Sequence, residues 1–121
     1  MRDTYEYSLL YDYYGGLLTG RQREVFELYY EENLSLSEIA VNLRISRQAV
    51  HRALGKAGDE LEGFEGKLGL IGKHAAYERV LTEVEARTGA ILKDKGRVAA
   101  LDPEAAKDLR RIMKLIRGLD I

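Results

Sequence analysis

The sequence predicts an all-α protein built around a helix-turn-helix motif, and three observations support this. Residues 35–57, SLSEIAVNLRISRQAVHRALGKA, fit two short helices joined by a tight turn. Apolar residues recur at helical spacing both before and after that stretch. The single proline, Pro103, follows an aspartate, which is the arrangement expected at the start of a last helix.

Two helices are expected ahead of the motif. Residues 5–18 carry an apolar face at helical spacing that consists of Tyr7, Leu10, Tyr11, Tyr14, Leu17 and Leu18. Thr19 and Gln22 then form a T-x-x-Q capping box for a second helix. The predicted buried stripe of that helix is Val25, Leu28 and Tyr29, and Glu31, Glu32 and Asn33 close it.

The helix-turn-helix motif has a cap for each of its helices. Ser35 and Glu38 form a second capping box, and the hydroxyl of Ser46 can accept from an N–H in the first turn of the second motif helix. The predicted inward residues are Ile39, Ala40, Leu43, Ile45, Val50, Ala53 and Leu54. The polar side chains left on the outside suit base edges and phosphates in a major groove, and these candidate nucleic-acid-binding residues are Arg44, Ser46, Arg47, Gln48, His51, Arg52 and Lys56.

A heptad pattern continues from the second motif helix. Its apolar seam is spaced 4-3-4-3-4-3 and consists of Val50, Leu54, Ala57, Leu61, Phe64, Leu68 and Ile71, and Ala75 extends it. Six glycines between residues 55 and 72 fall off the seam, and each costs about 1 kcal/mol relative to alanine inside a helix. We therefore expect a partner surface, either a second copy of the chain or the C-terminal helices, and a kink among the glycines is an acceptable variant.

The C-terminal part is predicted to contain two more helices. One lies near residues 76–88 and uses Ala76, Val80, Leu81 and Val84; a short apolar segment at Ile91 and Leu92 follows, and then a loop around Gly96. Asp102 caps the last helix, whose inner stripe is Leu109, Ile112, Met113 and Ile116. Opposite that stripe lies a basic stripe that could track a nucleic-acid backbone or touch an anionic membrane: Lys107, Arg110, Arg111, Lys114 and Arg117. The expected division is residues 1–60 as the helix-turn-helix domain and 61–121 as a helical C-terminal or dimerisation region.

Composition limits the classes of function. The 121 residues contain no cysteine and only two histidines, so neither a disulfide scaffold nor a metal site is expected. No secretory signal or membrane span is predicted, which indicates a cytoplasmic protein. No arrangement of catalytic residues is recognisable, and no enzyme activity or cofactor is expected. The net charge of −1 argues against strong generic binding of nucleic acid.

Residues 18–71, with the stretches RQREVFELYY, SRQAV and KLGL, resemble the YlxM family of small bacterial helix-turn-helix proteins. The opening YSLLYDYYGGLLT is similar to the first helix of that family, so the resemblance covers roughly residues 5–75. A more distant similarity links the block to region four of bacterial sigma factors. The resemblance implies a role around the signal recognition particle. Arg44 departs from the pattern, because many such turns have a left-handed glycine there, and a strained or differently shaped turn is expected.

Two functions remain open at this point. The first is a dimeric nucleic-acid-binding regulator whose target is DNA or, by the resemblance, the RNA of the signal recognition particle. The second is an acidic adaptor that binds a protein of that particle, in which the helix-turn-helix no longer reads DNA. Seven Lys or Arg against ten Asp or Glu in residues 1–60 favour the adaptor.

Overall fold

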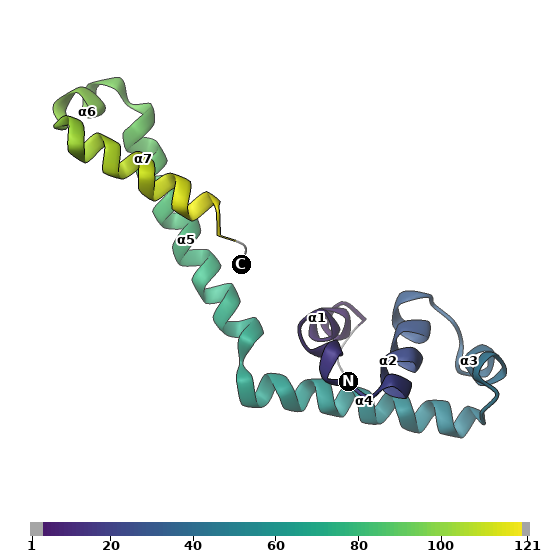
Figure 1. Ribbon diagram of the computed structural model, residues 1–121. Coiled ribbons are helices and arrows are strands. Elements are labelled where there is room, and N and C mark those ends of the chain that lie inside the picture. The colour runs from purple at the N-terminus through teal and green to yellow at the C-terminus, as the bar shows by residue number, and fades with distance from the viewer. Residues whose placement is uncertain (1–3, 120–121) are drawn as a thin grey trace. The chain divides into compact units, whose positions relative to one another are not determined.

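The computed structural model describes residues 4–119, which contain seven α-helices and no strand (Figure 1). The predicted all-α class is confirmed. The chain divides into two compact units, Met1–Ile71 and Gly72–Ile121, and each is described by itself. We expected a boundary after residue 60, but the helix there runs on without a break, so the division falls later in the chain.

The first unit is built on one long helix. Helix α4 (Arg47–Leu68) contacts α1 (Thr4–Tyr14), α2 (Gly20–Phe26) and α3 (Leu36–Leu43), which lie along it in Figure 1. A short 3-10 turn (Gly15–Leu17) links α1 to α2, and Leu17, predicted to be on the apolar face, is 58% exposed. The turn ends the α-helical repeat after Tyr14, so Leu17 leaves that face.

An aromatic cluster joins α1 to α2. Phe26 is fully buried, stacks on Tyr11 with ring centroids 5.1 Å apart, and meets Tyr30 at 4.5 Å. We predicted Tyr29 as the buried residue, but it is 37% exposed. The cause is a π-helical turn (Glu27–Glu31), which widens the helix and changes which side chains face inward. The T-x-x-Q box at Thr19 and Gln22 is present as predicted.

The N-terminal helices cover the heptad seam. Ala57 and Leu61 are fully buried in a cluster with Tyr7, Leu10 and Tyr14 of α1, and Leu54, Phe64 and Ile71 pack against the same cluster. Val50 lies under α2 and α3 instead, and Leu68 is 45% exposed. We expected the seam to be covered by a second copy or by the C-terminal helices; α1 takes that place because its own apolar face matches the seam.

The kink among the glycines occurs at one position. Gly69 has a positive φ of 62° and ends α4, and α5 (Leu70–Lys93) begins at the next residue. The hydroxyl of Tyr14 accepts from the Leu70 N–H at 3.0 Å and donates to Glu65 Oε1, which also accepts from the Ile71 N–H at 3.1 Å. Two first-turn amides of α5 are thereby satisfied by side chains of α1 and α4.

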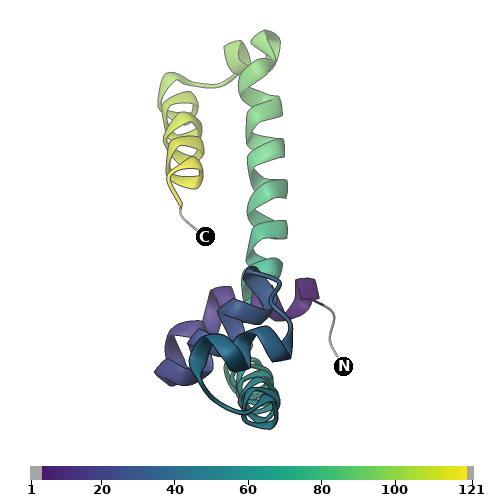
Figure 2. The same ribbon diagram turned by 90° about the vertical axis from the view of Figure 1, so that its right-hand side faces the viewer.

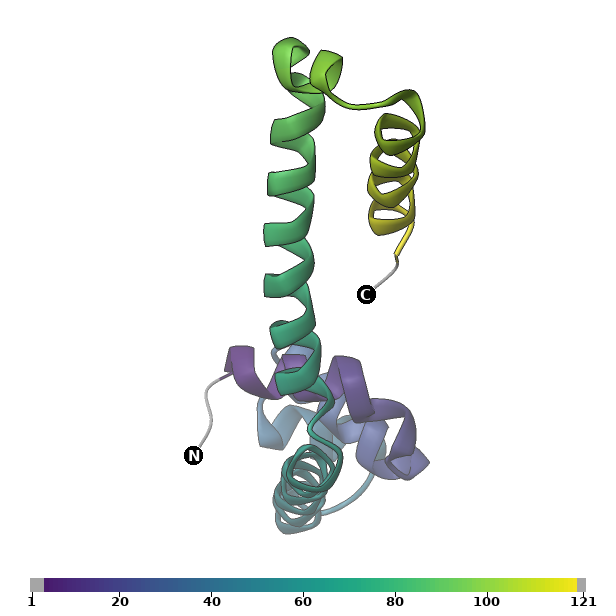
Figure 3. The ribbon, with the colours of Figure 1, turned by 90° about the vertical axis from the view of Figure 1, so that its left-hand side faces the viewer.

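The second unit is a loose helical hairpin. Helix α7 (Pro103–Arg117) runs back beside α5, as Figures 2 and 3 show from two sides. The segment predicted as a loop around Gly96 contains a short helix instead, α6 (Lys95–Ala100), because Asp94 caps it by accepting from the Arg97 N–H. Asp102 caps α7 as predicted.

Few side chains of this hairpin are buried. In residues 72–119 the buried ones are Thr88, Ala106 and Met113. Val80 and Val84, two apolar residues of the predicted 76–88 helix, are 60% and 38% exposed, because α5 has only one long neighbour within its unit. The predicted helix at 76–88 and the apolar segment at 91–92 are both parts of α5.

Candidate nucleic-acid interface

The turn between α3 and α4 carries an arginine in a conformation that glycine prefers. Arg44 has φ 58° and ψ 44°, the left-handed region expected at this position. Its N–H donates to the carbonyl of Val41, and the Ile45 N–H donates to the carbonyl of Ala40 at 3.0 Å. These two bonds close a Schellman turn, so the chain leaves α3 sharply and re-enters a helix three residues later.

Serine caps fix both helices of the motif. Ser35 accepts from the Glu38 N–H at 3.1 Å and donates its own N–H to the Glu38 carboxylate at 3.0 Å. These bonds hold the pKa of Glu38 below its ordinary value, with the Ser35 backbone N–H as the largest cause. Ser46 accepts from the Ala49 N–H at 3.0 Å, which defines where α4 begins.

A small apolar core lies directly beneath the motif. Val25, Ile39 and Val50 come from α2, α3 and α4, and all three are fully buried. The predicted inward residues Ala40, Leu43, Ile45, Ala53 and Leu54 pack around them. The inner side of the first turns of α4 is therefore fixed, and its polar side has to face outward.

The structure places every candidate nucleic-acid-binding residue on the surface. The exposed set is Arg44, Ser46, Arg47, Gln48, His51, Arg52 and Lys56. Residues 47, 48, 51 and 52 share one face of α4, since side chains three and four positions apart lie on the same side of a helix. That face is therefore open to a ligand within the first unit.

The charged residues of the first unit are unevenly distributed along the chain, which the net charge alone does not show. Residues 39–58 contain no Asp or Glu, whereas they contain four cationic side chains, Arg44, Arg47, Arg52 and Lys56. Within residues 4–119 none of these four forms an ion pair. The acidic residues of the first unit lie outside this stretch, so the turn and the first turns of α4 carry a local positive charge on a chain of net charge −1.

An aromatic hollow beside His51 was not predicted from the sequence. A cavity of about 200 Å³ is lined by His51, Leu54 and Gly55 of α4 with Tyr7, Tyr29, Tyr30 and Leu36. These residues come from α1, the π-helical turn, α3 and α4. No local spacing in the sequence could have indicated this hollow, because only the tertiary fold brings the segments together.

The basic stripe belongs to the other unit. Lys107, Arg110, Arg111, Lys114 and Arg117 are all exposed on α7, as expected from their spacing. Arg117 pairs with Glu85 of α5, with 3.2 Å between Nε and Oε1.

In the described part of the chain no group of three or more acidic or histidine side chains could hold a metal ion. Among the same residues, no helix combines the length and apolar character that crossing a bilayer requires.

Comparison with known proteins agrees with the motif. A family model, UPF0122, described as "Putative helix-turn-helix protein, YlxM / p13 like", matches residues 1–97. The chain belongs to the UPF0122 family. The resemblance noted from the sequence motifs is confirmed, and the UPF0122 match includes all of α1 to α5 but not α7.

Three UPF0122 relatives illustrate the match. A UPF0122 protein of Thermoanaerobacter sp. (strain X514) is 41% identical over 114 residues, 94% of this chain and 93% of that protein. One of Acetivibrio thermocellus is 38% identical over 121 residues, 98% of this chain and 97% of its own. One of Caldanaerobacter subterraneus subsp. tengcongensis is 50% identical over 78 residues, 64% of this chain and 67% of its own.

Proposed function

We propose that this protein is a nucleic-acid-binding regulator that places the first turns of α4 in the major groove of DNA. One observation carries the proposal. The acid-free stretch of residues 39–58 presents four exposed cations that form no ion pair with residues 4–119, from a turn and helix start that caps and core hold in place. Recognition helices of this class contact base edges with their N-terminal residues and contact phosphates from the flanks.

The positions suggest a division of labour. Arg47, Gln48 and His51 stand in the first turns of α4, so they are assigned to base edges. Arg44 in the turn and Lys56 further along α4 are assigned to phosphates on either side. Because affinity then depends on few cations, binding is expected to be modest, and log K should fall with log salt by about 0.9 for each neutralised phosphate.

The test is salt-dependent binding of the full chain to a short labelled DNA duplex, followed by fluorescence anisotropy. Arg47→Ala with Arg52→Ala should lower affinity at least about tenfold, since a bidentate arginine contributes roughly 1–3 kcal/mol. The slope of log K against log salt should also flatten by about 0.9 for each phosphate that the variant no longer neutralises.

A matched control removes the same charge elsewhere in the first unit. Arg21 and Lys67 are exposed on α2 and at the end of α4, and changing both to alanine should leave affinity nearly unchanged. Equal losses in the two double variants, or no loss in either, would contradict the proposal.

The finer role and the assembly state are also proposals. By its likeness to the YlxM family, the chain acts around the signal recognition particle. Its target is then the RNA of that particle or DNA near the genes of the particle. A homodimer would present two α4 helices about 34 Å apart to two half-sites. The seam residues Ala57 and Leu61 are already buried against α1 of their own chain, so the interface of such a dimer has to consist of exposed side chains.

One observation favours a second candidate, an adaptor that binds a basic protein of the same machinery. Residues 1–71 carry 12 Asp or Glu against 8 Lys or Arg. In that case a partner protein stays bound after Arg47→Ala with Arg52→Ala. It is released when exposed acids such as Glu24 and Glu31 are changed to glutamine.

A further inference from the structure

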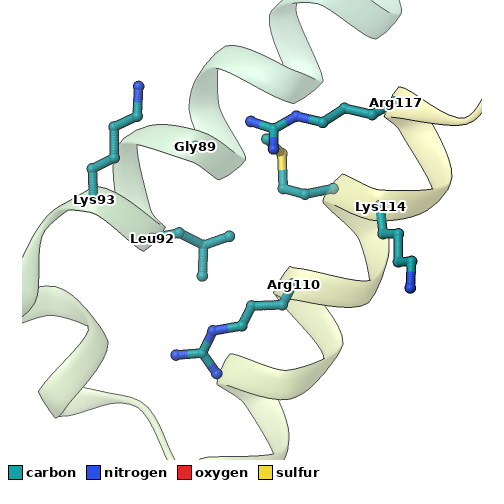
Figure 4. Close-up of a pocket in the computed structure, with 7 residues that line it drawn as sticks. Gly89, Leu92, Lys93, Arg110, Lys114 and Arg117 are labelled. Atoms are coloured by element: carbon teal, nitrogen blue, oxygen red, sulfur yellow. The ribbon is translucent and has the colours of Figure 1, made fainter.

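The second unit contains a cationic groove that the proposed function does not use. A hollow of about 370 Å³ lies between the end of α5, where Leu92 and Lys93 line it, and α7, where Arg110, Met113, Lys114 and Arg117 line it. Figure 4 shows Leu92 pointing into the space between the helices, while Arg110 and Arg117 reach from α7 toward α5. We call this hollow the α5–α7 groove.

The floor of the groove is apolar and its edge is charged. Met113 is 5% exposed and Leu92 is half-buried, and together they form the floor. Glu85 accepts from Arg117 Nε at 3.2 Å and so orients that guanidinium, whose two terminal nitrogens form no ion pair with residues 4–119. Arg110 and Lys114 form no ion pair with any residue in the 4–119 range.

The cations of the groove are arranged in a row along α7 and are not clustered at one position. Lys107, Arg110, Lys114 and Arg117 follow one another three or four residues apart, so the row runs along one side of α7 for about 15 Å. A free phosphate or a single carboxylate can contact one or two of these side chains, whereas an extended chain of phosphates can contact all four. Residues 72–121 carry 11 Lys or Arg against 8 Asp or Glu, which also favours a polyanion.

The apolar floor of the groove indicates whether the polyanion is a duplex or a single strand. In a duplex the bases are stacked inside, and an apolar floor beside the phosphates would contact nothing. In a single strand the bases are free to lie on apolar surfaces and on guanidinium planes. We propose that the α5–α7 groove binds a single strand of nucleic acid, with its phosphates along the cation row and a base over Leu92 and Met113.

This site is independent of the helix-turn-helix, because all its residues belong to the second unit. The test uses the full chain and a labelled oligouridylate, with fluorescence anisotropy at several salt concentrations. Arg110→Gln with Lys114→Gln should weaken binding about tenfold and flatten the salt slope by about 1.4, from about 0.7 for each phosphate of a single strand.

The matched control keeps the charge change and moves it out of the groove. Lys73 and Arg79 are exposed on α5 and neither lines the hollow nor belongs to the basic stripe, so changing both to glutamine should alter affinity less than about threefold. Leu92→Ala should reduce oligouridylate affinity without changing the salt slope, because it alters the floor alone. Circular dichroism checks helicity, and Lys93→Gln replaces the double variant if that variant loses helicity.

Several results would overturn this inference. They are equal losses in the groove and control variants, a loss of duplex DNA affinity in Arg110→Gln with Lys114→Gln as large as the loss of oligouridylate affinity, uridine triphosphate binding as tightly as the oligouridylate, and polyglutamate competing as well as the strand does. Arg47→Ala with Arg52→Ala should leave oligouridylate binding unchanged, so failure of this site and failure of the proposed duplex site give different results.

Discussion

Arg44 adopts a backbone conformation that costs an arginine energy. A left-handed conformation costs an L-residue roughly 1–2 kcal/mol, and glycine adopts it freely. The turn needs this conformation because it closes with bonds to the carbonyls of Ala40 and Val41. The proposed phosphate contact of the exposed Arg44 side chain would offset this cost in the bound state.

Arg44→Gly should therefore separate stability from binding. The variant should be more stable by about 0.5–1 kcal/mol in urea unfolding, after the larger chain entropy of glycine is subtracted. Its affinity for duplex DNA should fall, because one phosphate is left without its cation. Arg44→Asn, which tolerates the left-handed region, should lose the same affinity; unchanged affinity in both variants would refute a role for this side chain.

Tyr14 is the residue that connects the most distant segments of the first unit. It is 1% exposed, and its hydroxyl bonds both Glu65 and the Leu70 N–H. Burial, and then the bond to Glu65, raise the pKa of Tyr14 above its ordinary value of 10.0. The folded state thus favours the neutral phenol. The stability that this provides is present below pH 10.0 and is lost as pH rises through the folded value.

Alkaline unfolding should reveal this effect. The urea midpoint should fall as pH rises above 10.0, and Tyr14→Phe should show a smaller fall over the same range. At neutral pH the same variant should be less stable by about 1–2 kcal/mol, because Glu65 and the Leu70 amide lose their partner. Identical pH profiles for the two proteins would show that Tyr14 does not ionise on unfolding.

At the scale of elements, features set by residues close together in the sequence were predicted, and features set by contacts between distant residues were not. The caps at Thr19, Ser35, Ser46 and Asp102 were predicted because each bond spans three residues. The exposed face of α4 was predicted for the same reason. The π-helical turn after Phe26 was not, because it depends on how the aromatic rings pack against α1.

The glycines of α4 and its end illustrate the same contrast. The number of glycines indicates that the helix is weak, but it does not indicate at which glycine the helix ends. Gly69 does so because its positive φ allows the turn and Tyr14 and Glu65 satisfy the amides that follow. Gly63 stays inside α4, and a side chain added there would meet no atom within 4 Å.

Two alanine substitutions should therefore have opposite effects. Gly63→Ala should stabilise the protein by roughly 0.5–1 kcal/mol, since it fills open space in a helix interior. Gly69→Ala should destabilise it by about 1 kcal/mol, because alanine has to adopt a left-handed conformation. Chemical denaturation measures both values, and a destabilised Gly63→Ala would contradict the continuous helix.

At the scale of the whole molecule, the two units differ in how much they bury. The first has two apolar clusters with eight side chains that are at most 1% exposed, including Phe26, Ile39 and Leu61. In residues 72–119 the hairpin buries only Thr88, Ala106 and Met113. Sequence periodicity found both sets of helices, but it could not show that α1 covers the seam or that α5 is left half uncovered.

Native-state hydrogen exchange should detect this difference. Amides in residues 74–117 should exchange at least about tenfold faster than those in residues 50–61, because local stability follows buried apolar contact. Leu61→Asp should abolish protection in the first unit. Equal protection of both units in the unaltered chain would show that the hairpin has support beyond its own three buried residues.

The pairing of α1 with the far end of α4 has a consequence for synthesis on the ribosome. The cluster of Val25, Ile39 and Val50 can close as soon as α4 starts to emerge. Tyr14 has to wait longer, since Glu65 and Leu70 are translated among the last residues of the first unit. We therefore expect the helix-turn-helix to form first in the nascent chain, and the tyrosine-rich α1, which precedes it in the sequence, to dock after it.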